Sequence, residues 1–240
     1  MKIGIIGYGK MGKEIEKIAI DRNHNITLIA DKEDFEKIKN INKEDVDVVV
    51  EFTNADVAID NYNYCFDKNI PVVSGTTGIE KAIFEGFINK VDKGNKSFFW
   101  ASNFSIGVNI TFKINEILAK MMNSQVDYNV KIKEIHHIHK LDSPSGTAIT
   151  LANGIIKNID RKTSWKNDAL VKDEEFSIES VREGEVPGTH IVEYSSEIDK
   201  ISLKHEAFGR KGFALGAVLA AEFIFDKTGV FSMKDLLIDN

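Results

Sequence analysis

Short apolar runs alternate with helix-like segments over the first hundred residues of the chain. Continuous apolar runs such as residues 48–50 are typical of strands buried on both faces of a parallel sheet. The predicted strands are residues 2–6, 25–30, 46–51, 71–74 and 97–100. Apolar residues at helical spacing predict helices at residues 12–20, 55–67 and 79–91. This alternation predicts a doubly wound parallel α/β domain with right-handed crossovers.

The pattern changes after about residue 105. A helix is expected over residues 107–122, followed by a strictly alternating strand over 126–132 and a second helix that starts near Gly146. Further extended segments are predicted at residues 175–182, 188–194 and 198–205. Long strands joined by short turns favour a mixed sheet in a second, α+β domain. The pattern leaves open which domain the apolar C-terminal helix covers.

Composition and charge exclude several classes of partner. Lys and Arg number 31 against 37 Asp and Glu, a net charge of −6, which argues against a chain built to coat nucleic acid or anionic lipid. The most apolar stretch, residues 213–225, is shorter than the roughly 20 residues of a membrane span. The N-terminal apolar run is too short for a signal-peptide core. With one cysteine, Cys65, we expect no disulfide framework and a reducing, cytoplasmic location.

A glycine-rich turn, GYGKMG, follows the first predicted strand. In a G-x-G-x-x-G turn the first glycine permits the bend, the second lets a pyrophosphate approach the backbone, and the third lets helix pack on strand. The N–H groups at the helix start then hold the phosphates. The alternative is a tight turn without a ligand. The predicted cofactor-binding residues here are Gly7, Tyr8, Gly9, Lys10, Met11 and Gly12.

The residues after the second predicted strand favour the dinucleotide interpretation. Asp31 stands 19 positions after Gly12, where a carboxylate binds the ribose hydroxyls. Lys32 follows it, and a lysine there would attract a 2′-phosphate that Asp31 alone repels. Lys32 is equally interpretable as a solvated loop lysine. The sequence therefore predicts NADH or NADPH as cofactor without choosing between them.

Two segments of small residues follow the fourth and fifth predicted strands. Open α/β sheets bind ligands at the carboxyl ends of their strands, and small residues let backbone groups approach a nicotinamide or its ribose. Taken alone, each segment is equally typical of an ordinary turn. The candidate cofactor contacts are Gly75, Thr76, Thr77, Ala101, Ser102, Asn103 and Phe104.

The densest polar segment is EIHHIHKLDSPSGT, residues 134–147. The apolar even positions of the preceding strand continue as Glu134 and His136, so polar groups enter the buried face where the strand ends. A row of titratable groups supplies anion binding and proton donation, and a hydroxyl-rich helix start offers a second anion site. The alternatives are a solvated strand end with a helix cap, or a metal site. We expect no metal, because no nearby carboxylate spacing completes a recognisable site.

These segments together resemble the dihydrodipicolinate reductases of bacterial lysine biosynthesis, nearly from end to end. The most specific segment is EIHHIHKLDSPSGTA, and VSGTTG, ASNFSIGVN and HEAFGRKGFALGA match in order and spacing. The resemblance implies a Rossmann-type dinucleotide-binding domain of residues 1–106 and 211–240. It implies a substrate-binding and oligomerisation domain of residues 107–210, and a homotetramer. Departures include Glu51, where Asp is usual, and Ser102, where Pro or Ala is usual; we expect them to touch the adenine end of the cofactor.

The resemblance also implies a reaction and roles for the residues. A hydride from nicotinamide C4 adds to a cyclic dicarboxylate with a conjugated imine, and the ring nitrogen gains a proton. His136 and Lys140 match the proton donors. The positions that match those holding the substrate carboxylates are His137, Ser145, Gly146 and Thr147. The remaining alternatives are another dehydrogenase of amino-acid metabolism, for example one acting on homoserine, and a catalytically silent NAD(P)-sensing regulator.

Overall fold

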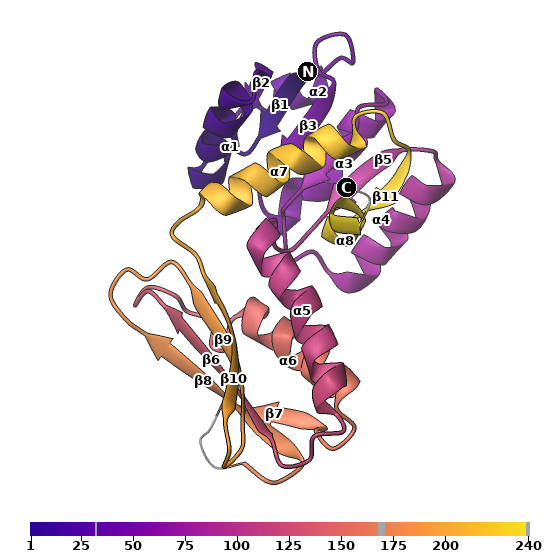
Figure 1. Ribbon diagram of the computed structural model, residues 1–240. Coiled ribbons are helices and arrows are strands. Elements are labelled where there is room, and N and C mark those ends of the chain that lie inside the picture. Colours follow the sequence, from indigo (N-terminus) through magenta and orange to yellow (C-terminus); the bar gives the residue numbers. More distant parts are fainter. Residues whose placement is uncertain (32, 168–170, 239–240) are drawn as a thin grey trace. The chain divides into compact units, whose positions relative to one another are not determined.

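The computed structural model describes residues 1–31, 33–167 and 171–238 (Figure 1). The chain divides into two compact units. One comprises Met1–Ile106 and Arg210–Asn240, and the other comprises Gly107–Gly209. No helix in the described part of the chain combines the length and apolar character that crossing a membrane requires.

The first unit is a six-stranded sheet in the order β11-β5-β4-β3-β1-β2, and every neighbouring pair is parallel. Its strands are β1 (Lys2–Ile6), β2 (Asn25–Ala30), β3 (Val48–Glu51), β4 (Val72–Ser74), β5 (Ser97–Trp100) and β11 (Gly229–Phe231). The predicted doubly wound α/β domain is thereby confirmed. The edge strand β11 was not predicted, since its three residues are too short to form a pattern.

Helices cover both faces of this sheet, because alternate strand residues point to opposite sides. Val48 and Val50 pack against α1 (Lys10–Asp21) and α7 (Lys211–Ile224). On the opposite face, Val49 packs in a cluster with residues of three further helices. Those helices are α2 (Phe35–Lys39), α3 (Ala55–Asp67) and α4 (Lys81–Lys93). A short final helix, α8 (Met233–Ile238), joins the α1–α7 face.

The apolar C-terminal segment forms helix α7, which packs in the core of the first unit. It lies across the sheet beside α1 (Figure 1), and Glu222 accepts two hydrogen bonds from the Arg22 guanidinium at 2.7 and 2.8 Å. A glycine lets α7 approach the segment that follows β5: a Cβ on Gly216 would lie 1.8 Å from the carbonyl oxygen of Phe104. The apolar run of residues 213–225 is therefore a core helix of the first unit.

The second unit is a five-stranded mixed sheet in the order β10-β9-β6-β8-β7. Strands β7 and β6 run parallel to β8, whereas β6–β9 and β9–β10 are antiparallel. Side chains of two helices form the core with one face of the sheet. The elements are α5 (Ile106–Met122), β6 (Asn129–His136), α6 (Gly146–Asn158), β7 (Ser164–Lys166), β8 (Glu175–Arg182), β9 (Thr189–Ser195) and β10 (Lys200–Glu206). The predicted mixed sheet is confirmed.

The strand predicted at residues 126–132 begins later, at Asn129, and continues to His136. The residues before it form a turn, in which Val126 is 71% exposed. Arg161 holds this turn, because its guanidinium donates to the backbone carbonyls of four preceding residues, Met122, Asn123, Gln125 and Tyr128. Carbonyl groups bound in this way are not available for strand pairing, so the apolar alternation alone placed the strand too early.

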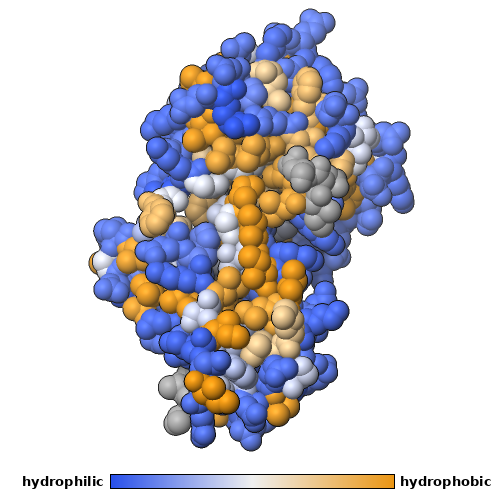
Figure 2. Space-filling model, in the orientation of Figure 1, coloured by the Kyte–Doolittle hydropathy of each residue, from blue (hydrophilic) through white to orange (hydrophobic). Residues whose placement is uncertain are grey.

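Helix α5 has a second, solvent-exposed apolar face. Figure 2 shows apolar side chains gathered over this helix between more polar surroundings. Four residues at helical spacing form the α5 stripe, with exposed fractions of 44–67%: Ile110, Ile114, Ile117 and Met121.

Candidate active site

The glycine turn between β1 and α1 has the geometry of a phosphate-binding loop. Gly7 has a φ of +93°, and a Cβ there would lie 2.1 Å from the carbonyl oxygen of Phe52. A Cβ on Gly12 would lie 2.3 Å from the Gly7 carbonyl oxygen, so only glycine lets the helix approach. Around Gly9, by contrast, no atom lies within 4 Å of such a Cβ. This open space beside the helix start fits a pyrophosphate against the backbone.

The other predicted cofactor residues follow strands of the same parallel sheet. Asp31 is exposed just after β2, and its amide donates to Asp34 at 3.1 Å; Lys32 lies outside the described residues. The 75–78 turn follows β4, and residues 101–104 follow β5. Because the carboxyl ends of parallel strands meet at one edge of a sheet, these segments lie at the same edge as the glycine turn. Their contacts with a dinucleotide remain predictions.

The structure distinguishes the roles available to residues 101–104. The Phe104 ring is buried in the core, with its centroid 5.5 Å from that of Phe52, so only its backbone is placed to meet a ligand. Ala101 is also buried, whereas Ser102 is exposed. The side-chain oxygen of Asn103 accepts the Ser105 amide at 2.9 Å and shapes the turn.

In the second unit, strand register builds the polar cluster. Glu134 on β6 lies opposite His190 on β9, and His190 lies opposite His205 on β10. On the other side of β6, His136 lies beside Arg182 of β8. Directly paired residues share one face of a sheet, so side chains far apart in sequence meet beneath the end of β6. His190 and Arg182 were not among the predicted site residues, because no local pattern marks them.

The carboxylate of Glu134 is the centre of this cluster and is fully buried. Both of its oxygens accept the Ser145 amide at 3.1 Å, and Arg182 donates to it at 3.3 Å. His136 Nδ1 lies 3.5 Å from one of its oxygens. Burial favours the neutral carboxyl, but the Ser145 hydrogen bonds and the nearby His136 hold the pKa of Glu134 below its usual value.

The two buried imidazoles are biased toward their neutral forms. Burial lowers the pKa of His136, although the negative charge of Glu134 opposes that shift. Burial also lowers the pKa of His190, to about 4. The two rings meet edge to face, with centroids 5.0 Å apart. A Cβ on Gly188 would lie 3.2 Å from His136 Nε2, so this glycine leaves room for the ring.

Ser145 joins the cluster to the start of α6. Its hydroxyl accepts the Ala148 amide at 3.2 Å as the N-cap, and its oxygen lies 3.1 Å from His190 Nε2. Its own amide donates to Glu134, so Ser145 holds the start of the helix in place. Gly146 is exposed, with no atom within 4 Å of a Cβ position, which leaves room for an anion beside the first turn.

In the segment after β6, His137 and His139 have different environments from the buried His136, and Lys140 lies near the cluster. The Nζ of Lys140 lies 2.7 Å from an oxygen of Asp142, and Arg182 donates to the Asp142 carbonyl at 2.6 Å. His137 is half-buried, and its Nδ1 has no hydrogen-bond partner among the described residues. His139 is exposed and pairs with Glu185 at 3.0 Å. The segment therefore offers one cation and one imidazole beside the buried His136.

No carboxylate spacing in the sequence predicted a metal site, but the fold groups one carboxylate with two imidazoles. Glu134, His136 and His190 bring three potential ligand atoms to within 4.8 Å of one another. The fold creates this grouping, because β9 supplies His190 from a distant part of the sequence. The Glu134 oxygens already accept hydrogen bonds from Ser145 and Arg182, so we assign the group to a hydrogen-bonded network. The absence of a bound metal remains a prediction.

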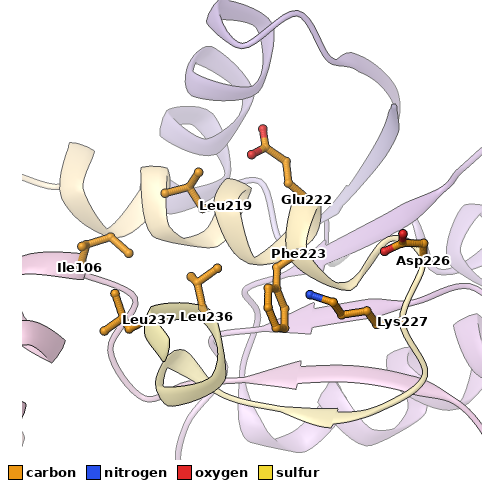
Figure 3. A pocket seen from close by; sticks show the side chains of 8 residues that line it. All are labelled: Ile106, Leu219, Glu222, Phe223, Asp226, Lys227, Leu236 and Leu237. Carbon is orange, nitrogen blue, oxygen red and sulfur yellow. The ribbon is translucent and has the colours of Figure 1, made fainter. Parts of the chain in front are cut away.

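A cavity of about 580 Å³ is lined by other residues than the predicted site residues (Figure 3). Apolar side chains of α7 and α8 line it together with a few charged ones, and the Lys227 ammonium lies 3.2 Å from the centroid of the Phe223 ring. Its lining residues are Ile106, Leu219, Glu222, Phe223, Asp226, Lys227, Leu236 and Leu237. None of them belongs to the glycine turn or to the histidine cluster.

A parallel sheet with a phosphate-binding glycine turn, together with an acid–base cluster beside a helix start, defines an oxidoreductase of the nicotinamide-dependent class. Two family models match nearly the whole chain: "Dihydrodipicolinate reductase, N-terminus" over residues 1–104 and "Dihydrodipicolinate reductase, C-terminus" over residues 107–237. The chain belongs to the dihydrodipicolinate reductase family and is an NAD(P)H-dependent oxidoreductase.

Relatives and solved structures agree with this assignment. The chain is 48% identical over 240 residues to the 4-hydroxy-tetrahydrodipicolinate reductase of Christiangramia forsetii, covering 100% of this chain and 98% of that protein. It is 36% identical over 239 residues to the enzyme of the same name from Thermosipho africanus, covering 99% and 98%. A dipicolinate-bound dihydrodipicolinate reductase from Paenisporosarcina sp. TG-14 has the same fold, with a TM-score of 0.79 at 20% identity and 97% of each chain covered.

Proposed function

We propose that this protein reduces 4-hydroxy-tetrahydrodipicolinate to tetrahydrodipicolinate with NADH or NADPH, in the biosynthesis of diaminopimelate and lysine. The observation that carries the proposal is the Glu134 network, which joins His136 to the Ser145 end of α6. It sets an acid–base group next to an anion-binding helix start, as reduction of a dicarboxylate imine requires. Full-length similarity to curated reductases supports the same substrate.

The first unit is the proposed dinucleotide-binding domain. Backbone groups of residues 7–12 hold the pyrophosphate in the space beside Gly9, and Asp31 binds the ribose hydroxyls. Residues 75–77 and 101–104 border the nicotinamide. When bound, the reduced nicotinamide supplies the hydride, and the protein supplies orientation and electrostatics.

The second unit, residues 107–210 in the sequence prediction, is the proposed substrate domain. The substrate carries two carboxylates, and the N-terminus of α6 at Gly146 and Thr147 receives one of them. His137 and Lys140 bind carboxylate oxygens, and Ser145 shapes the cradle as its N-cap. The ammonium group of Lys140 attracts the doubly negative substrate by its charge.

The proton for the ring nitrogen comes from His136 or Lys140. Burial favours neutral His136, so its protonated form depends on the adjacent Glu134 carboxylate and on the charge of the substrate. Lys140 combines carboxylate binding with proton donation. Both groups belong to the one segment that Arg182 holds through the backbone of residues 140–142.

We place the enzyme in the cytoplasm, where its single, buried Cys65 needs no partner. We also propose a homotetramer, as the family resemblance implies. The α5 stripe supports association, because exposed apolar patches mark interaction surfaces.

A coupled assay tests the proposed reaction. The upstream synthase makes the substrate from pyruvate and aspartate semialdehyde, and the absorbance of the reduced cofactor should fall when this protein is added. A dehydrogenase of homoserine would respond to that substrate instead, and a silent sensor would bind the dinucleotide without turnover. A chelator should leave the rate unchanged, since the cofactor carries the hydride.

A further inference from the structure

A second buried carboxylate, Glu51, ends β3 in the first unit and is fully buried. It accepts the Ser74 hydroxyl at 2.7 Å and the Thr76 hydroxyl at 2.9 Å. The hydroxyl of Thr53 and its amide, at 3.1 Å, also donate to it. Its partners in the described part of the chain are hydroxyls and an amide, with no cationic side chain among them. One strand, β1, lies between β3 and the strand β2 that precedes Asp31. The expected contact of Glu51 with the adenine end of the cofactor remains a prediction.

The hydroxyl, amide and carbonyl of Thr76 are all hydrogen-bonded within the protein. The Thr76 hydroxyl donates to Glu51, its amide donates to the Ser74 hydroxyl at 3.1 Å, and its carbonyl accepts Trp100 Nε1 at 2.9 Å. Thr76 is 4% exposed, whereas the adjacent Thr77 is exposed. Two neighbouring threonines with the same chemistry therefore have opposite environments, one anchored in the protein and one facing solvent.

The backbone next to Glu51 holds the same turn. A Cβ on Gly75 would lie 2.1 Å from the ring of Phe52, so the glycine lets that ring pass beneath the turn. The Gly75 amide donates to the Glu51 carbonyl at 3.1 Å. The carboxyl ends of β3 and β4 are thus joined by main-chain and side-chain bonds, and the 75–78 turn is built on that junction.

We propose that Glu51 is a positioning residue for the dinucleotide: by anchoring Thr76, it holds the 75–78 turn so that Gly75 and Thr77 face the cofactor. The inference rests on the proposed function. Glu51 then acts through Thr76, which the sequence grouped with Thr77 as an equal contact. A carboxylate suits this role because both oxygens only accept, whereas the NH₂ group of a glutamine would face hydroxyl and amide donors.

The test measures NADH binding to the full-length protein by calorimetry, with thermal unfolding as a second readout. Glu51→Gln should weaken NADH binding by roughly tenfold, the effect of one misplaced charge-assisted hydrogen bond. Glu51→Asp retains the charge and should stay within about threefold of the wild type. If Glu51→Gln fails to fold, Thr76→Val tests the same interaction, because it deletes only the hydroxyl that donates to Glu51.

A double-mutant cycle separates anchoring from contact. Glu51→Gln and Thr76→Val should be non-additive in the free energy of NADH binding, because the two side chains share one interaction. Thr77→Val is the matched control: the same atom is lost one residue later, and its effect should add to that of Glu51→Gln. Trp100 emission in the cofactor-free protein should change with Glu51→Gln and Thr76→Val and stay constant with Thr77→Val, since Trp100 is bonded to Thr76.

Two results would overturn the role of Glu51. One is a lower melting temperature with unchanged NADH affinity in Glu51→Gln, which would make the carboxylate purely structural. The other is full additivity of Glu51→Gln with Thr76→Val. A wild-type protein that binds neither NADH nor NADPH would instead overturn the proposed function itself, and the role of Glu51 with it.

Discussion

Glu134 of β6 lies directly opposite His190 of β9, and its carboxylate oxygen is 3.8 Å from His190 Nε2. The same carboxylate accepts the Ser145 amide at 3.1 Å, and the Ser145 oxygen lies 3.1 Å from that imidazole. These contacts close a small buried ring of polar groups between a strand end and a helix start. His136 and the N-terminus of α6 therefore keep a fixed geometry, which is what preorganised proton transfer to a bound anion needs.

Replacing Lys140 should affect turnover most strongly. Lys140→Ala removes a cation and a proton donor, so we expect kcat to fall by roughly a hundredfold or more, with a higher KM for the dicarboxylate. Steady-state kinetics with the coupled assay measures both constants. The matched control is His139→Ala in the same segment, whose exposed side chain pairs with Glu185 and should leave kcat nearly unchanged. Near-normal turnover in Lys140→Ala would contradict the assigned role.

His136 and His137 should separate into different kinetic effects. His136 belongs to the buried Glu134 network, so His136→Ala should act mainly on kcat. His137→Ala should act mainly on KM, because it loses a contact felt equally by substrate and transition state. Cofactor affinity, measured by calorimetry, should survive both changes, since the glycine turn belongs to the other unit. Loss of NADH binding in either variant would refute this division.

Two glycines of the turn should respond to alanine in opposite ways. The Cβ of Gly9→Ala enters open space, so the fold should keep its melting temperature while the dinucleotide binds roughly tenfold or more weakly. Gly12→Ala puts a Cβ 2.3 Å from the Gly7 carbonyl oxygen and should cost roughly 1–3 kcal/mol of stability. Thermal unfolding and calorimetry on both variants check the contrast. Equal losses of stability would show that Gly9 does not border a ligand space.

Acid should destabilise the folded protein between about pH 6.5 and pH 4. The pKa of His190 is about 4 in the fold, against roughly 6.5 in an unfolded chain. Between those values the unfolded chain binds a proton that the folded protein does not, so stability falls as the pH falls. His136 and His205, whose pKa values burial also lowers, act in the same direction.

Melting temperatures measured across that pH range test the linkage. His190→Asn should flatten the pH dependence, whereas His139→Asn, which changes an exposed side chain, should preserve it. A wild-type melting temperature that is constant from pH 6.5 to pH 4 would contradict the neutral, buried state of these imidazoles.

Cofactor choice is the remaining sequence-based prediction. We expect NADH and NADPH to be used within about an order of magnitude of each other, since a 2′-phosphate meets attraction from Lys32 beside repulsion from Asp31. Lys32→Ala should weaken NADPH more than NADH, and kcat/KM for each cofactor measures the difference. Equal losses would identify Lys32 as a surface lysine only.

Sequence patterns were sufficient where the determining interactions are local. The apolar runs of β1 and β3 and the helical spacing of α3 predicted the parallel sheet and its layers, because burial on both faces requires apolar residues throughout. GYGKMG predicted a turn whose three glycines have three different surroundings in the structure. The start of β6 was placed too early, since Arg161 binds the turn before it from a residue far along the chain.

What the sequence by itself determined is therefore the order of the longer strands and helices, the glycine turn, and the segment that carries His136 and Lys140. Only the tertiary structure decided that His190 and Arg182 complete the Glu134 network, and that Thr76 is anchored to Glu51 while Thr77 faces solvent. The physical reason is strand register. Pairing brings side chains from distant segments to hydrogen-bond distance, and no local periodicity specifies which residues will meet.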